Sequence, residues 1–472
     1  MSSIKRNFLF NLSYQILALI TPLITTPYIS RVLGPEGTGR YSFAHSVAYY
    51  FVMFAILGVN NYGNRTIAMV REDKNEMSKS FWGIYLFQLF SSFVMITLYI
   101  IYVAYYATDK PIGWIFLGYV ISAALDINWL FFGLEEFKVT VTRRVIIKII
   151  SVASIFIFVN TRADVTTLAM IFVLEIIFTQ VILWLMIPKK VNFVRVSFTD
   201  ITKHIKANIV LFVPILAISV YRFMDKIMLG ILTNKTEVGF YEASEKIIQV
   251  PIAIINSLGM VMLPRTSNLI AKNEIEKSKE YISKSIIFAI FLASSMSFGI
   301  MAVAEEFVPL FFGPGFEKVI IIFQALLPSC LFLAFSDVIR SQYLIPNNKN
   351  NIFILSVIMG ATINIIANIL LIPRYASIGA AIGVSFAEAA VCIMHCYGAK
   401  DELPIMLYIK LSIPFVLAGL VMYIVLINLH LGYSSIVSLG IKVLLGTIIY
   451  FLVIGIFYCK HIVLYLKNKL LH

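Results

Sequence analysis

Apolar residues form runs of about 20 along almost the whole chain, and short polar segments separate them. A run of that length is what an α-helix needs to cross the hydrocarbon core of a bilayer. The pattern predicts about fourteen membrane-spanning helices and no sizeable soluble domain. The expected spans lie near 8–30, 42–60, 80–106, 112–134, 145–160, 165–187, 207–230, 239–263, 282–304, 319–345, 351–372, 377–398, 408–428 and 436–459.

A set of residues in the first half of the chain recurs 200 positions later. Arg65 follows Tyr41 by 24 residues, and Arg265 follows Tyr241 by the same 24 residues. A duplicated set of hydrophobic helices is typical of transporters built from two lobes around a central site. The recurring residues are Gly39, Tyr41, Arg65, Thr66, Glu76, Ser78 and Lys79, which return as Gly239, Tyr241, Arg265, Thr266, Glu276, Ser278 and Lys279.

The duplication predicts an all-α polytopic membrane protein. We expect two six-helix lobes, at 1–190 and 191–400, related by a pseudo-two-fold axis along the membrane normal. The remaining residues, 401–472, would form two additional transmembrane helices and a basic cytoplasmic tail. The first ten residues contain no small-residue cleavage site, so we expect them to begin the first helix and not a signal peptide.

Composition supports this class and sets a topology. The chain is 60% hydrophobic and only 13% charged, with a mean hydropathy of +0.89. Its net charge of +13 does not indicate nucleic acid, because about 26 Lys and Arg fall in segments on one side of the predicted membrane and about 7 on the other. This bias predicts a multi-pass membrane protein with both termini in the cytoplasm.

Motifs for enzymatic chemistry are missing from the sequence. There is no phosphate-binding loop of the G-x-x-x-x-G-K-[ST] type, no H-E-x-x-H and no G-x-S-x-G. Cys392, His395 and Cys396 are close in sequence, but two thiols and one imidazole do not complete a zinc set. We therefore expect neither an enzyme nor a cofactor or metal, and energy would come from an ion gradient, the membrane potential or consumption of the product.

Polar residues inside the first span fall on one helical face. Asn7, Asn11 and Gln15 are each four residues apart. The stripe either lines a cavity or hydrogen-bonds to a neighbouring helix, and the sequence leaves both open.

The seventh span carries three charged residues, Arg222, Asp225 and Lys226. A charge at membrane depth costs at least about 2.5–3.5 kcal/mol, so the group needs water, partners or a ligand. The two cations either face an anionic substrate or leave one cation beside an internal Arg222–Asp225 pair. The other predicted substrate contacts are Arg31, His45, Glu245 and Arg340.

Four carboxylates recur at similar places in the two lobes. Asp126 and Asp337 lie in the fourth span of each lobe, and Glu175 and Glu388 in the sixth. Buried carboxylates carry protons or bind sodium when their protonation is switchable. They serve equally as structural partners of Arg340, Arg143 or Arg144, and both readings stay open.

Two continuous runs resemble a known family. The run from Pro27 to Ala44, PYISRVLGPEGTGRYSFA, and the run from Leu57 to Arg65, LGVNNYGNR, are similar to bacterial polysaccharide repeat-unit flippases of the Wzx type. These belong to the multidrug/oligosaccharidyl-lipid/polysaccharide exporter superfamily. The resemblance implies a V-shaped bundle that moves a polyprenyl-diphosphate-linked oligosaccharide to the outer leaflet by alternating access, for O-antigen or capsule assembly.

The implied cargo fits the intramembrane charges. Arg and Lys suit a diphosphate or acidic sugars, while the polyprenyl tail needs only an apolar groove, which the two unpaired C-terminal spans are placed to form. The implied partners are the lipid bilayer, H⁺ or Na⁺, and polysaccharide polymerase machinery.

Three alternatives remain. They are a drug or metabolite exporter of the same superfamily, a peptidoglycan lipid-precursor flippase, and a membrane-embedded polymerase or ligase. The last would need a large external loop bearing catalytic Arg or His, and no predicted outer loop is that long.

Overall fold

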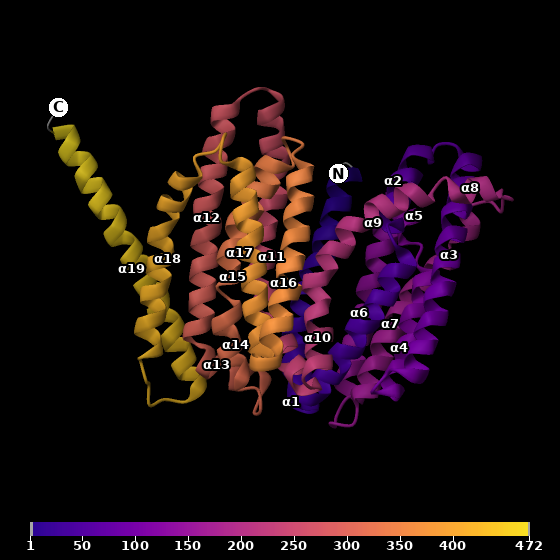
Figure 1. Cartoon of the computed structure of the whole chain (residues 1–472), viewed down its shortest axis with the longest axis horizontal. Helices are drawn as coiled ribbons and strands as arrows, with labels where there is room; N and C mark the ends of the chain where they lie inside the picture. The colour runs from indigo at the N-terminus through magenta and orange to yellow at the C-terminus, as the bar shows by residue number, and fades with distance from the viewer. Residues whose placement is uncertain (1–2, 471–472) are drawn as a thin grey trace. The chain divides into compact units, whose positions relative to one another are not determined.

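The computed structural model describes the backbone of residues 3–470 and the side chains of residues 17, 20–216, 218–220 and 223–457. Regular structure in the described residues is helical throughout, which confirms the predicted fold class. The chain divides into two compact units, Met1–Gly239 and Phe240–His472 (Figure 1).

The first unit contains one very long helix followed by shorter ones. Helix α1 has a kink at Gly34, whose φ of 67° and ψ of −179° precede Pro35. The helices are α1 (Ser3–Ile56), α2 (Val59–Val70), α3 (Lys74–Tyr105), α4 (Lys110–Leu125), α5 (Asn128–Gly133), α6 (Phe137–Phe158), α7 (Val165–Trp184), η1 (Ile187–Lys189), α8 (Phe198–Thr202), α9 (Ile205–Ser219), η2 (Val220–Met224) and α10 (Asp225–Leu232).

Helix α11 (Lys235–Ala271) begins in the first unit and continues into the second. Within the second unit, α16 packs against α17, and α12 packs against α18 (Figure 1). The remaining helices are α12 (Ile275–Ala302), α13 (Ala304–Phe312), α14 (Lys318–Leu326), α15 (Ser329–Ile339), η3 (Arg340–Leu344), α16 (Asn350–Tyr375), α17 (Ser377–Ala399), α18 (Ile405–Ile427) and α19 (Ser435–Leu470).

Eleven helices in the described part of the chain are long and apolar enough to cross a membrane. One of them, Ile20–Val70, has 51 residues. It contains the kink at Gly34 and the turn between α1 and α2, and at about 1.5 Å per residue it has enough residues for two crossings of a hydrocarbon core of about 30 Å. The charged helix α6 and the interrupted α9–α10 segment are not among the eleven. The count of fourteen therefore stays a prediction.

The segment after the first six expected spans packs onto the first unit. Helix α9 contacts α2, and α10 contacts α1. The repeat in the sequence assigns residues 191–239 to the second lobe. Helices of one repeat can nevertheless pack against helices of the other, as α9 and α10 do here. The lobe boundaries at 190 and 400 therefore stay predictions.

The polar connection before α9 is fixed to the ends of α2 and α3. His204 Nδ1 and the Tyr62 hydroxyl share a hydrogen bond of 2.7 Å, and Asp200 Oδ1 lies 3.1 Å from Lys79 Nζ. Burial lowers the pKa of His204 to about 4. Hydrogen bonds from Ser197, followed by the charge of Lys79, hold the pKa of Asp200 well below its usual range. The histidine is therefore neutral at physiological pH, and the carboxylate is ionised.

Two glycines that are equivalent in the repeat lie against each other in the first unit. A Cβ atom on Gly39 would lie 1.6 Å from the carbonyl oxygen of Lys235, and one on Gly239 would lie 1.9 Å from that of Pro35. Positions 35 and 235 also differ by the repeat length of 200. The contact is thus reciprocal, as it is between two helices related by a two-fold axis. It gives the duplicated glycines a physical reason, since only glycine permits this approach.

Candidate functional site

A polar cavity of about 430 Å³ lies within the first unit. Its walls come from the second half of α1, the start of α2, and helices α4, α6, α7 and α9. The polar and aromatic lining residues are Tyr49, Asn60, Asn61, Tyr119, Ser122, Asp126, Arg144, Lys148, Glu175, Thr179 and Gln180.

The fourth expected span is interrupted at this cavity. Asp126 has extended backbone angles between α4 and α5, and its Oδ1 accepts hydrogen bonds from the backbone N–H of Asn128 at 3.0 Å and from Asn128 Nδ2 at 2.6 Å. The side-chain amide of Gln88 donates to the carbonyl oxygens of Ala123 and Asp126, at 2.7 and 2.8 Å. Broken helices of this kind occur at transporter sites, where irregular backbone must find partners inside the protein.

A network of buried side-chain hydrogen bonds stabilises the break between α4 and α5. Asn128 Nδ2 donates to Gln180 Oε1 at 2.9 Å, and Arg143 Nη2 donates to Asn128 Oδ1 at 2.9 Å. Trp129 Nε1 donates to Gln88 Oε1 at 3.1 Å. Arg143 is only 6% exposed and does not line the cavity. The network therefore fixes the backbone around Asp126 as one wall of the cavity.

Glu175 is paired in this structure. Lys148 Nζ lies 2.9 and 3.1 Å from the two carboxylate oxygens of Glu175. We considered Arg143 and Arg144 as structural partners for the intramembrane carboxylates, and the structure gives Lys148 for Glu175. Arg144 is one turn away on the same face of α6, and its guanidinium lies 5.5 Å from the ring centre of Phe132. The sequence prediction missed Arg144 and Lys148 as lining residues, although their i,i+4 spacing places them on one helical face.

His45 lies in an aromatic cluster and is not among the cavity-lining residues. Its ring centre is 5.0 Å from that of Phe172 and 5.6 Å from that of Tyr119. Tyr49 stacks on Phe223 with ring centres 3.8 Å apart. The aromatic cluster thus adjoins the cavity where Tyr49 and Tyr119 line it.

The charged group of the seventh span lies where the helix changes its winding. Residues Val220–Met224 form a π-helical turn, a feature that is frequent at functional sites. Asp225 and Lys226 are buried, and Lys226 Nζ lies 5.5 Å from the ring centre of Phe223. Neither lines the 430 Å³ cavity. The side chains of Arg222, Asn7, Asn11 and Gln15 lie outside the described side chains.

A second π-helical turn, η3, begins at Arg340 in the second unit. Arg340 forms an ion pair with Asp337, which is one of the structural partnerships we considered. His395 is held by hydrogen bonds, with Nδ1 3.2 Å from the Ser336 carbonyl oxygen and Nε2 2.8 Å from the Ser356 hydroxyl. Glu388 and Glu245 are partly buried, and Arg31 is exposed.

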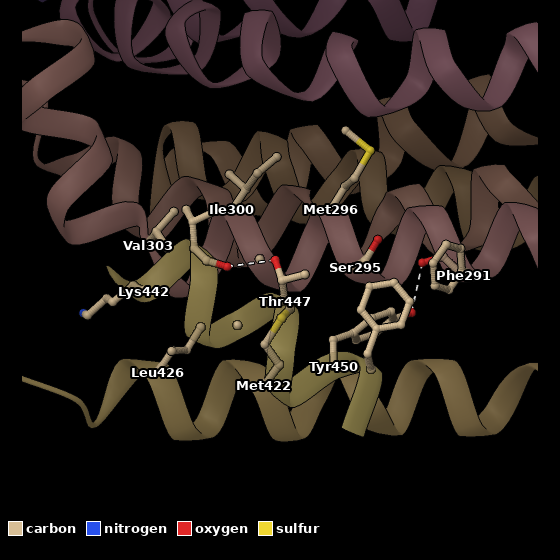
Figure 2. Close-up of a pocket in the computed structure, with 14 residues that line it drawn as sticks. Phe291, Ser295, Met296, Ile300, Val303, Met422, Leu426, Lys442, Thr447 and Tyr450 are labelled. Carbon is tan, nitrogen blue, oxygen red and sulfur yellow. Dashed lines mark hydrogen bonds between the residues drawn. The ribbon is translucent and has the colours of Figure 1, made fainter. Parts of the chain in front are cut away.

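The second unit contains an apolar groove of about 350 Å³. It lies between α12 and the two C-terminal helices α18 and α19, with Lys442 at one end and Phe291 and Tyr450 at the other (Figure 2). Lys442 Nζ pairs with Glu306 Oε1 at 2.6 Å, and the two side chains are only 3% and 16% exposed. Helices α18 and α19 therefore contribute an apolar surface, and its use by a hydrocarbon tail stays a prediction.

The helices, the broken span and the two cavities define a polytopic helical membrane protein with a transporter-like architecture. A family model described as "Polysaccharide biosynthesis protein" matches residues 4–270. The chain belongs to this polysaccharide biosynthesis family, and the resemblance seen in the runs 27–44 and 57–65 is confirmed.

Curated relatives extend the similarity over most of the chain. A protein of Escherichia coli (strain K12), named as an O-antigen transporter, is 24% identical over 398 residues. The match covers 82% of this chain and 95% of the relative. A Haloferax volcanii protein named as a probable low-salt glycan biosynthesis flippase is 22% identical over 238 residues, with 49% of each chain covered.

Solved structures agree on the fold. A lipid II flippase in an inward closed conformation has a TM-score of 0.74 at 15% identity, covering 96% of this chain and 100% of that one. An inward-facing multidrug transporter of the MATE family has a TM-score of 0.60 at 12% identity, covering 84% and 99%. At these identities the likeness establishes the fold alone.

Proposed function

We propose that the protein is a flippase that moves polyprenyl-diphosphate-linked oligosaccharide repeat units from the cytoplasmic to the outer leaflet of the bacterial inner membrane. The observation that carries this proposal is the presence of two chemically different cavities in one chain. The first unit has a polar cavity of about 430 Å³, and the second has an apolar groove of about 350 Å³. A cargo with a sugar part and a hydrocarbon part needs both.

The physical problem of the cargo fits these surfaces. A diphosphate and its sugars cannot cross about 30 Å of hydrocarbon unaided, so protein groups must replace their hydration. The tail is soluble in lipid and needs only the groove formed by α12, α18 and α19. The names of the relatives, an O-antigen transporter and a glycan flippase, support transport rather than catalysis.

We assign the predicted charged and polar residues to the cargo path. Arg222 and Lys226 would attract the diphosphate or acidic sugars, and Asp225 would hold Arg222 in place when cargo is absent. The other proposed cargo contacts are Asn7, Asn11, Gln15, Arg31, His45, Glu245 and Arg340.

A peptidoglycan lipid-precursor flippase is the second candidate function. The fold is compatible with it, since the solved lipid II flippase has a TM-score of 0.74, but a shared fold at 15% identity does not favour one cargo over the other. Transport of one cargo and not the other distinguishes the two functions.

The proposal predicts flipping by the purified protein in vesicles. Proteoliposomes should expose a fluorescent polyprenyl-diphosphate oligosaccharide to an external quencher far faster than protein-free vesicles do. Arg222→Ala should lower the rate by at least about tenfold, since a charge-assisted contact to phosphate is worth about 1.5–3 kcal/mol. Arg222→Lys should recover only part of it, because an ammonium lacks the planar fork of the guanidinium. Equal rates with and without protein would contradict the proposed function.

The same vesicles test ion coupling. Asp126, Glu175, Asp337 and Glu388 are the proposed carriers of a proton or sodium ion. An imposed gradient of the coupling ion should then change the flipping rate. If the rate is the same with every gradient collapsed, the four carboxylates are structural.

Labelling of single cysteines tests the proposed topology with both termini in the cytoplasm. In a background without the four native cysteines, Lys74→Cys and Lys277→Cys should resist a membrane-impermeant maleimide in intact cells. Arg162→Cys lies in a predicted outer loop and should react. All three positions are exposed, so accessibility within the protein does not confound the comparison. Rapid labelling at 74 or 277 would reverse the topology.

A further inference from the structure

We propose that the cavity of the first unit is a subsite for one sugar ring of the cargo, and that Asn60 and Asn61 bind its hydroxyl groups. This inference rests on the proposed function and makes it more specific. The charges around the cavity, its size and the position of the two amides support it.

The charges around the cavity balance. Its ionisable lining residues are two cations, Arg144 and Lys148, and two anions, Asp126 and Glu175. A diphosphate carries several negative charges and would need a net positive site in a medium of low dielectric constant. A neutral ring with many hydroxyl groups does not, and each hydroxyl both donates and accepts a hydrogen bond.

The size of the cavity also suits a ring. A cation held directly by protein oxygens sits about 2.3–2.6 Å from them and would occupy only a small part of about 430 Å³, so an ion at Asp126 or Glu175 leaves room for a ring. Small-molecule sites typically have volumes of about 300–1,000 Å³. Tyr49 and Tyr119 add aromatic surface to the lining, against which the C–H groups of a sugar ring can pack.

A tight turn between α1 and α2 presents the two amides. Leu57 has a positive φ of 51°. A Cβ atom on Gly58 would lie 2.3 Å from the carbonyl oxygen of Asn208, so only glycine fits this position. The turn starts α2 at Val59, and Asn60 and Asn61 follow as exposed cavity-lining residues. This gives the run LGVNNYG a function, because its first two residues make the turn and its asparagines line the cavity.

Helix α7 supplies further polar groups to the lining. Thr179 and Gln180 come from α7, and Gln180 is fixed through its hydrogen bond with Asn128. Amides from α2 and α7 offer donors and acceptors, which is the pattern that a polyhydroxylated ring requires. The carboxylate of Glu175 and the ammonium of Lys148 are paired with each other. The amides are therefore the main groups proposed to form hydrogen bonds with the hydroxyl groups of the ring.

The test compares two lipids that differ only in the sugar. The double variant Asn60→Ala/Asn61→Ala is assayed in proteoliposomes with polyprenyl diphosphate carrying one hexose and with the same polyprenyl diphosphate without sugar. Loss of two amides should lower flipping of the sugar-bearing lipid by about tenfold at low lipid concentration. Flipping of the sugar-free lipid should not change.

Asn64→Ala is the matched control, because Asn64 is an exposed asparagine one turn further along α2 and does not line the cavity. It should leave both rates unchanged. An equal fall for both lipids in the double variant, or no fall for either, would overturn the sugar subsite while leaving the flippase function intact. A wild-type protein that flips neither lipid would contradict the proposed function and this inference with it.

Discussion

Gly39→Ala and Gly239→Ala are each expected to destabilise the protein strongly and to stop transport. The new methyl group would lie 1.6 Å from the backbone oxygen of Lys235 in the first variant and 1.9 Å from that of Pro35 in the second. Because the clashing atoms belong to the backbone, no side-chain rotation relieves the contact, and the helices must move apart. We expect a cost of at least about 3 kcal/mol, the upper end of the usual range for overpacking. The measurement is the melting temperature of the purified protein in detergent.

Gly440→Ala provides the control for this experiment. Gly440 lies in α19, and a Cβ atom there would have no neighbour within 4 Å. Since alanine favours a helix over glycine by about 1 kcal/mol, this variant should be as stable as the wild type or slightly more stable. If Gly39→Ala and Gly239→Ala melt at the wild-type temperature, the close reciprocal contact does not exist in the folded protein.

The repeat was visible in the sequence, but the contact between its members was not. Gly39 and Gly239 stand out at an offset of 200 because the residues around them also recur. Periodicity along a chain reports which faces are apolar, and it carries no information on which two faces meet. The sequence therefore predicted the equivalence of the two positions, and the structure was needed to find that they touch.

At the candidate site too, the sequence identified individual residues but not the contacts between them. Asp126 and Glu175 were recognisable because ionisable residues inside apolar runs are costly. Their partners were not, since Lys148 is 27 residues from Glu175 and is brought to it by the packing of α6 against α7. The expected span began at 145, whereas α6 already begins at Phe137. The basic residues just before position 145 therefore belong to the helix, and Arg144 among them lines the cavity.

Asn60 and Asn61 were noticed only as part of a resemblance. Nothing in their spacing distinguishes amides that line a cavity from amides at a solvated helix end. Their placement depends on the positive φ of Leu57 and on the approach of the Asn208 carbonyl to Gly58. Both are consequences of tertiary structure, so local sequence alone did not predict the role of these asparagines.

The second large effect is expected at the ion pair beside the apolar groove. Lys442 is 3% exposed and Glu306 is 16% exposed, with 2.6 Å between Nζ and Oε1. Oε2 of Glu306 is buried and accepts no hydrogen bond in the described structure. Lys442→Met would leave this carboxylate without its cation in an apolar environment. Removing one partner of a buried pair typically costs about 3–5 kcal/mol.

The double variant Lys442→Met/Glu306→Gln should recover most of that loss, because a neutral amide is far less costly to bury than an unpaired charge. Melting temperatures of the two single variants and the double variant form a double-mutant cycle that isolates the interaction. Lys284→Met is the control, since Lys284 pairs with Glu280 at 2.6 Å but both side chains are more than 60% exposed. Water screens such a pair, so its melting temperature should match the wild type. If Lys442→Met is as stable as Lys284→Met, the ion pair does not fasten α19 to α13, and the groove must be held by apolar packing alone.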